Sequence, residues 1–192
     1  MSPKALSSVV DAVLSFWFGG PEDSGYGENR EAWFQKDPNF DREIETRFAD
    51  LIADAAAGHL DSMAESPEGA VALVIILDQF PRNIYRDDAR AFAQDAKARA
   101  IAEQAIARKF DTMLMPVMRK FLYLPFEHSE DLADQDLAMA LFAALGAEDL
   151  EWAEKHRAII AEFGRFPHRN AALGRVSTPE EEAFLTRPGS SF

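Results

Sequence analysis

The sequence predicts an all-α protein, a bundle or solenoid-like array of about eight to ten helices in one domain over residues 1–192. Apolar residues recur at helical spacing in segment after segment, and no run alternates apolar and polar residues as an amphipathic strand does. Several segments open with a capping residue followed by proline, the signal of a helix start. A chain of this length can bury one substantial core.

The first helix is predicted to end at Phe18, because Gly19-Gly20-Pro21 follows it. Its apolar residues share one face at helical spacing: Leu6, Val9, Val10, Val13, Leu14, Trp17 and Phe18. Residues 21–29 are rich in glycine and acid, which predicts a mobile loop. A short helix holding Trp33 and Phe34 comes next.

Two later helices begin with a cap and a proline, at Asp37-Pro38 and at Ser66-Pro67. The first of them continues to Gly58, a typical helix end. The second leads into residues 70–77, which are apolar on every side and rich in β-branched residues. A buried strand is therefore the alternative there. We favour a buried helix, because the cap is good and no second strand is available for pairing.

Further helices are predicted from alanine-rich or periodic segments, and most end at glycine or proline. They cover residues 88–110, 116–124, 130–145 and 149–163. Their apolar positions, which include Leu137 and Trp152, are expected to face the core. A short last helix starts at Thr178-Pro179, within a C-terminal segment of residues 176–192.

Composition excludes several classes of function. The chain has no cysteine, so it cannot form disulfides or a thiolate zinc site. A net charge of −13 disfavours binding to nucleic acid or to an anionic membrane. The longest apolar run is too short to span a bilayer. We therefore expect a soluble cytoplasmic protein, and we predict neither a cofactor nor a metal.

Two similar segments stand out because each follows an apolar helix, crosses Phe-Pro and then presents Arg and Asn. They are Asp78-Gln79-Phe80-Pro81-Arg82-Asn83 and Gly164-Arg165-Phe166-Pro167-His168-Arg169-Asn170. Proline disfavours the helical region for the residue before it, so Phe80 and Phe166 are expected to be extended or at a helix end. Residues 163–178 hold three arginines and no acid, which favours a local anion site. The predicted ligand-binding residues are Gln79, Arg82, Asn83, Arg165, His168, Arg169 and Asn170.

A second set of polar residues could support acid–base chemistry. Glu127, His128 and Ser129 follow Pro125 at a predicted helix end, and His156 lies on the apolar face of its helix. The catalytic candidates are Asp78, Glu127, His128 and His156.

Structural roles remain open for the same residues. Ser129 could cap a helix that starts at Glu130, and His156 could be a hydrogen-bonded core residue. Arg82 has the i, i+4 spacing for an ion pair with Asp78.

Five segments resemble one known family in the order in which the family has them. They are Val13-Leu14-Ser15-Phe16-Trp17-Phe18-Gly19, Trp33-Phe34-Gln35-Lys36-Asp37, Asp78-Gln79-Phe80-Pro81-Arg82-Asn83, Leu122-Tyr123-Leu124-Pro125-Phe126-Glu127-His128-Ser129-Glu130-Asp131 and residues 164–175. Together they resemble the bacterial domain of unknown function 924 family over nearly the whole chain. The resemblance implies a tetratricopeptide-like α-α superhelix. It implies no activity and no catalytic residue.

The sequence thus leads to three hypotheses. The first is binding of a small anionic ligand or a peptide end in a pocket lined by Arg and His at helix ends. The second is an acid–base enzyme that uses Glu127, His128 and His156. The third is a protein–protein interaction scaffold in which the arginines only lock helix ends.

Overall fold

The computed structural model describes residues 2–191, and the described chain is helical with no strand. This confirms the all-α fold class. Backbone contacts group the chain into two compact units. The first comprises residues 1–86 and 90–125, and the second comprises residues 87–89 and 126–192. The organisation as one domain and the tetratricopeptide-like arrangement stay predictions.

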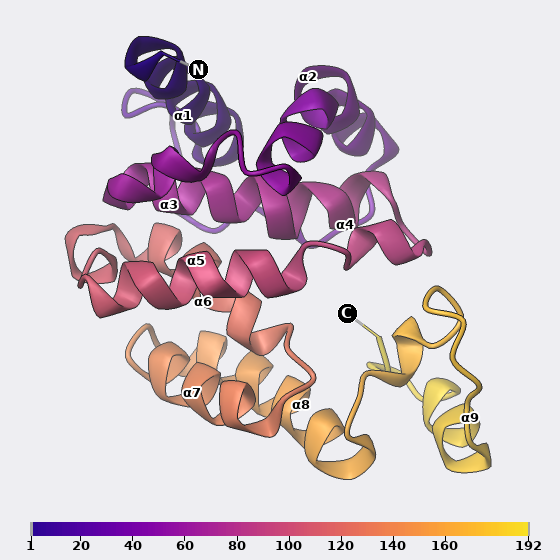
Figure 1. The fold of residues 1–192 in the computed structure, drawn as a ribbon. Coiled ribbons are helices and arrows are strands. Elements are labelled where there is room, and N and C mark those ends of the chain that lie inside the picture. The colour runs from indigo at the N-terminus through magenta and orange to yellow at the C-terminus, as the bar shows by residue number, and fades with distance from the viewer. Residues whose placement is uncertain (1, 192) are drawn as a thin grey trace. The chain divides into compact units, whose positions relative to one another are not determined.

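The helices of the first unit follow one another along the chain, joined by loops and short 3₁₀ segments (Figure 1). They are α1 (Pro3–Phe18), α2 (Pro38–Ala56), α3 (Pro67–Val74), α4 (Phe80–Ile84), α5 (Asp95–Ala107) and α6 (Pro116–Glu127), whose last two residues belong to the second unit. The predicted starts are confirmed for α2 and α3. Asp37 accepts hydrogen bonds from Asn39 and Phe40 N–H, and Ser66 Oγ accepts one from Gly69 N–H at 3.2 Å.

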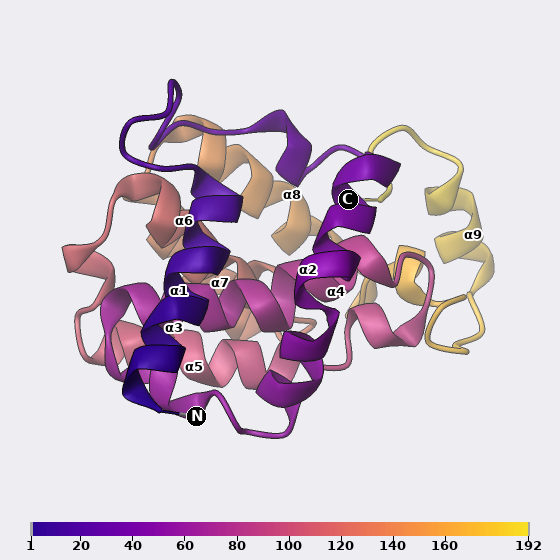
Figure 2. The same ribbon diagram turned by 90° about the horizontal axis from the view of Figure 1, so that it is seen from above.

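The core of the first unit is centred on α3. No residue from 70 to 77 has exposed surface, which confirms a buried helix rather than a strand. The helix contacts α1 on one side and α5 on another, and Figure 2 shows α1 running across it. At the end of α1, Trp17 stacks on Trp33 with ring centroids 6.0 Å apart, and it meets Phe80 and Phe121 edge-on. The apolar runs of the sequence therefore meet in one aromatic-rich core.

The helix does not break at the first Phe-Pro, which corrects one prediction. Residues Ile75–Gln79 form a π-helix, in which Phe80 N–H donates to the carbonyl of Ile75, five residues earlier. Phe80 itself is helical, with φ −57° and ψ −42°. The π-turn changes the hydrogen-bond register just before Pro81, which has no N–H to donate. The chain thereby passes the proline without leaving the helix.

The second unit is built on an antiparallel pair, α7 (Leu132–Ala143) and α8 (Ala147–Phe163), followed by α9 (Pro179–Leu185). α7 and α8 pack against each other and lie side by side in Figure 1. Gly164 ends α8 in the left-handed conformation, with φ 68°. Phe166 is extended, as predicted, and packs fully buried against Ile159 and Ile160.

Other differences from the sequence-based predictions lie at helix boundaries and on helix faces. Helix α5 begins at Asp95, later than predicted, because residues 88–94 form turns and a short 3₁₀ segment. Helix α6 continues through Pro125 to Glu127. Leu137 and Trp152 were expected in the core, but their exposed fractions are 40% and 48%. In a two-helix layer, the outer face meets no third element, so apolar residues there stay at the surface.

The packing around Gly69 gives a first testable prediction. A Cβ at Gly69 would overlap the backbone carbonyl of Met63 and lie 2.7 Å from Ser66 Oγ, the cap of α3. We expect Gly69→Ala to destabilise the protein by about 2 kcal/mol. Helix propensity alone would predict a stabilisation of about 1 kcal/mol. Urea unfolding decides between the two signs.

The matched control is Gly20→Ala, where the added methyl group meets only Asp23 Oδ2 at 3.6 Å. Its unfolding midpoint should stay close to that of the wild type. A Gly69→Ala protein as stable as this control would show that α3 can move away from Met63 at little cost.

Candidate functional site

The π-helix places Asp78 inside the first unit with no exposed surface. Its carboxylate accepts a hydrogen bond from Gln79 Nε2 at 2.5 Å and lies 3.1 Å from Arg82 Nη1. Arg82 also holds Asp95 through two hydrogen bonds of 2.9 and 2.8 Å. Burial alone would lower the pKa of Arg82, but the carboxylates of Asp78 and Asp95 outweigh it and raise the pKa. The predicted i, i+4 pair is confirmed, within a larger network.

The rest of the first Phe-Pro segment is tied to α2. Asn83 Nδ2 donates to Asp41 Oδ1 at 2.9 Å, and Arg86 grips both oxygens of the same carboxylate at 2.8 Å. Asp41, Arg86 and Asp95 were not among the predicted site residues, because nothing in the local sequence pattern shows that they meet. Asn83 and Arg82 therefore link α4 to α2 and α5 through their side-chain hydrogen bonds.

In the second unit, Arg165 is held by the carboxylate of Glu181, which was not among the predicted site residues. Its Nε and Nη2 donate to Glu181 at 2.6 and 2.7 Å, and Asn170 Nδ2 donates to the same side chain at 3.2 Å. Glu181 also completes a capping box with Thr178 at the start of α9. The hydrogen bonds from Arg165 and the Thr178 N–H lower the pKa of Glu181 to about 2. Glu181 stays ionised at neutral pH.

A second arginine–carboxylate pair fixes the loop after α8. Arg175 donates to both oxygens of Glu130 at 2.7 and 2.9 Å, and Phe166 N–H donates to Glu130 at 2.8 Å. Partial burial would raise the pKa of Glu130. The Arg175 and Phe166 hydrogen bonds, with the charge of Arg169, instead lower it. Two of the three arginines in the acid-free segment, Arg165 and Arg175, are thus paired with acids from elsewhere in the unit.

The acid–base candidates of the second unit meet at one place. Glu127 Oε1 lies 3.2 Å from His156 Nδ1, and the two residues are only 4% and 5% exposed. The ring of His128 lies 6.4 Å from that of His156, and Phe166 packs edge-on against His156 at 5.7 Å. His168 contacts the other side of this group, 5.6 Å from the Phe166 ring. We call Glu127, His128, His156, His168 and Arg169 the histidine cluster.

Two acceptors surround Nδ1 of His156. The Trp152 carbonyl lies 2.9 Å away and Glu127 Oε1 lies 3.2 Å away. Nδ1 therefore carries the proton, and Nε2 carries the lone pair. Burial lowers the pKa of His156 to about 3, and the nearby charges of His128, Arg169 and His168 act in the same direction. His156 is neutral at pH 7.

Two buried side chains hold the backbone of this cluster. Gln135 Nε2, with no exposed surface, donates to the carbonyls of Glu127 and Ser129 at 2.6 and 2.7 Å, and approaches that of Phe126 at 3.5 Å. Arg169 Nη1 donates to the carbonyl of His128 at 3.0 Å. Four successive carbonyls at the end of α6 are thus satisfied without a glycine cap. We call Gln135 and Arg169 the carbonyl clamp.

The next helix is capped by Asp131 rather than by Ser129, which corrects the predicted cap. Asp131 Oδ1 accepts the N–H of Ala133 at 2.8 Å. Ser129 instead accepts the Asp131 N–H and donates to Asp134 at 2.6 Å. Because α7 begins two residues later than expected, the capping position moves from Ser129 to Asp131.

The structure sorts the predicted site residues into two groups. Asp78, Gln79, Arg82 and Asn83 lie in the first unit; Glu127, His128, His156, Arg165, His168, Arg169 and Asn170 lie in the second. A pocket shared by both Phe-Pro segments stays a prediction. In residues 2–191, no three His, Asp or Glu side chains are arranged to hold a metal ion. Nor does any described helix combine the length and apolar character of a membrane span.

Comparison with known proteins agrees with this architecture. A solved structure from Agrobacterium tumefaciens, described as a protein of unknown function, matches with a TM-score of 0.84 and 41% identity. The match covers 93% of this chain and 97% of the other. The sequence pattern of the family described as bacterial protein of unknown function, DUF924, matches residues 13–189. The chain belongs to the DUF924 family.

No functionally curated protein matches the chain. The DUF924 family and the Agrobacterium structure support the fold and the family resemblance seen in the sequence, and neither description names a ligand or a reaction. The chemistry of this DUF924 protein therefore has to be argued from its own side chains.

The second prediction follows from the lowered pKa of His156. An unfolded histidine titrates near 6.5, whereas folded His156 stays neutral down to about pH 3. Below pH 6.5 the unfolded chain binds a proton that the folded chain refuses, so the stability present above pH 6.5 is lost as the pH falls. We expect wild-type protein to lose about 3 kcal/mol more than His156→Gln between pH 7 and pH 4.5.

Urea unfolding at the two pH values measures this difference. His59→Gln serves as control, because His59 is exposed and its side chain bonds only Asp54. It should lose stability in parallel with wild type. Parallel losses in all three proteins would mean that His156 is protonated in the folded state.

The carbonyl clamp makes the third prediction. Gln135→Met keeps the side-chain length but removes the donor, leaving the buried carbonyls of Glu127 and Ser129 unsatisfied. We expect a loss of about 1–3 kcal/mol in unfolding free energy. We also expect the side-chain NMR signals of His128 and His156 to move, because the backbone that carries Glu127 and His128 loosens.

Gln104→Met is the control, since Gln104 is exposed on α5 in the first unit. If Gln135→Met lost stability and left both histidine signals in place, the clamp would support the fold and have no part in positioning the cluster.

Proposed function

We propose that this DUF924 protein binds a small anionic molecule at the histidine cluster and uses His156 as the proton acceptor. The observation that supports it best is the 3.2 Å contact between Glu127 Oε1 and His156 Nδ1, two almost fully buried groups beside two further histidines. This joins the first two hypotheses from the sequence at one location. His128 and His168 are half-buried, so the cluster reaches the surface while His156 lies beneath.

The arrangement around His156 suits proton transfer. A carboxylate that accepts from one imidazole nitrogen fixes the tautomer and the ring orientation, and it stabilises the imidazolium that forms when the other nitrogen takes a proton. Glu127 and the Trp152 carbonyl occupy Nδ1, so Nε2 is the basic atom. In this proposal a substrate O–H or N–H gives its proton to Nε2.

The low pKa of His156 explains why an anion is part of the proposal. At pH 7 and without a bound anion, protonating His156 costs about 5 kcal/mol, because its pKa is about 3. An anion about 5 Å from the ring returns roughly 3 kcal/mol at an effective dielectric constant of ~20. Binding would therefore raise the pKa by about two units and make His156 a useful base only when substrate is present.

The positively charged guanidinium of Arg169 near His156 supports the same charge preference. His128, Arg169 and His168 all lie close enough to influence its pKa. The proposed anion site includes His128, His168 and Arg169. Arg82 and Arg165 have bidentate carboxylate partners in Asp95 and Glu181, and their predicted ligand contacts receive no support from this geometry.

Histidine NMR provides the fourth prediction. We expect ¹⁵N spectra to show His156 neutral with its proton on Nδ1 from pH 7 down to pH 4. Inorganic phosphate, acetate, succinate and citrate are titrated in turn. At least one should move the His128, His156 and His168 signals saturably and raise the His156 pKa by about two units.

Glu127→Gln and His156→Gln should each weaken that response, and His59→Gln in the first unit should not. A panel that moves His59 as much as His156, or that moves none of the cluster, would count against the proposal. So would a His156 proton on Nε2, since the basic atom would then point at Glu127.

The third hypothesis also has a specific observation in its favour. Arg82, Arg165 and Arg175 are each bound bidentately by a carboxylate from another helix or loop. This is what a scaffold with structural arginines requires. It leaves the histidine cluster unexplained, so we rank it second.

A further inference from the structure

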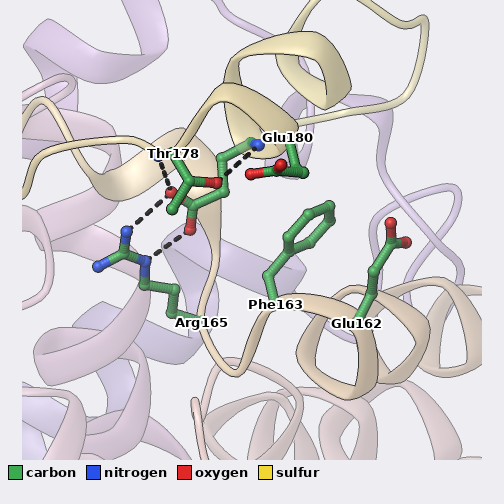
Figure 3. A pocket seen from close by; sticks show the side chains of 6 residues that line it. Glu162, Phe163, Arg165, Thr178 and Glu180 are labelled. Atoms are coloured by element: carbon green, nitrogen blue, oxygen red, sulfur yellow. Dashed lines mark hydrogen bonds and ion pairs between the residues drawn. The ribbon is translucent and has the colours of Figure 1, made fainter.

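An open pocket of about 500 Å³ lies in the second unit between the end of α8 and the start of α9. It is distinct from the histidine cluster and shares none of its residues. Figure 3 shows the Phe163 ring on one wall, with Glu162 and Glu180 on either side of it. The full lining is Glu162, Phe163, Arg165, Thr178, Glu180 and Glu181.

The charge of this pocket is opposite to what the arginine-rich sequence predicted. Arg165 and Glu181 neutralise each other through hydrogen bonds of 2.6 and 2.7 Å. Glu162 and Glu180 are both exposed, and in residues 2–191 neither makes a side-chain hydrogen bond or ion pair. The lining therefore carries two uncompensated negative charges.

The aromatic wall is suited to the same kind of ligand. Phe163 packs against Phe184 with ring centroids 5.0 Å apart. The guanidinium carbon of Arg187 lies 5.9 Å from the Phe184 centroid, so this aromatic pair already has a cation of the chain on one side. The face of an aromatic ring attracts cations through its quadrupole, and flanking carboxylates add to that attraction.

We propose that this pocket binds an alkylammonium group, with its methylene chain on Phe163 and its charge between Glu162 and Glu180. The pocket itself, an aromatic wall with two unpaired acids at its rim, carries the inference. The group could belong to a free polyamine or to a lysine side chain, which offer the same chemistry. Exposed ion pairs and cation–π contacts are weak, so the expected Kd is on the order of millimolar. Salt should weaken binding further.

The fifth prediction uses two probes, putrescine and Nα-acetyl-lysine methylamide, titrated into ¹⁵N-labelled full-length protein at low salt. The backbone signals of residues 162, 163 and 180 should shift saturably. 1,4-Butanediol, the uncharged analogue of putrescine, should cause no such shift. Binding of both amines, or of one, supports the site and tells which source of the group it accepts.

Variants separate the pocket from general attraction to an acidic protein. Glu162→Gln with Glu180→Gln should weaken binding roughly tenfold, and Phe163→Leu should weaken it severalfold. Both acids are exposed, so the double variant should fold normally. The matched control is Glu154→Gln, because Glu154 is an exposed acid in the middle of α8 that does not line the pocket.

Equal loss in Glu154→Gln and in the double variant would overturn the proposal, as would shifts that do not saturate. Phosphate that shifts the signals of residues 162, 163 and 180, while the amines do not, would show the pocket to be an anion site. These readouts do not involve the histidine cluster, so either proposal can fail without the other.

Discussion

Within each unit, carboxylates that are distant in the sequence pair with guanidinium groups and fix the irregular segments. At helix ends and at the π-turn, the regular hydrogen-bond pattern is interrupted and backbone carbonyls lose their usual partners. Asp95 holds Arg82 in the first unit, and Glu130 and Glu181 hold Arg175 and Arg165 in the second. Removing one member of such a partly buried pair leaves the other charge buried without its partner, which lowers the stability of the fold. The loops can therefore be irregular only because these pairs are complete.

The same pairing rule shows why the histidine cluster differs from the rest of the molecule. A bidentate arginine–carboxylate pair satisfies both partners and has little left to offer a ligand. A neutral imidazole held on one nitrogen retains a lone pair on the other. His156 is in that state because burial and its neighbours lower its pKa, while Glu127 and Trp152 fix the ring. In the second unit, the basic nitrogen of His156 therefore differs chemically from the arginines that are paired with carboxylates.

Much of the fold could be predicted from local pattern, because helix caps and apolar spacing act over one or two turns. Ser66-Pro67 and the buried run after it were sufficient to predict α3. The π-turn before Pro81 was not predictable, since no sequence signal distinguishes it from a helix end. Trp152 was misplaced because its spacing shows a helical face but not whether another element covers it.

The residues of the candidate site could be predicted from the sequence better than the residues that hold them in place. Glu127, His128 and His156 were selected from residue type and position, and they lie together in the second unit. Their supports, above all Gln135, were missed, because a buried glutamine on an apolar helix has no local signature.

Long-range charge pairing also reversed the meaning of the arginine-rich segment. Counted along the chain, residues 163–178 are basic; counted in space, the acids of Glu130 and Glu181 cancel Arg175 and Arg165. Glu162 and Glu180 remain at the end of α8, while Arg169 lies close enough to His156 to lower its pKa. The two proposed sites would prefer ligands of opposite charge, and solvent screens exposed charges that lie more than about 8–10 Å apart. In both proposals, local pairing sets the charge of the ligand, and the net charge of −13 acts on what approaches from a distance.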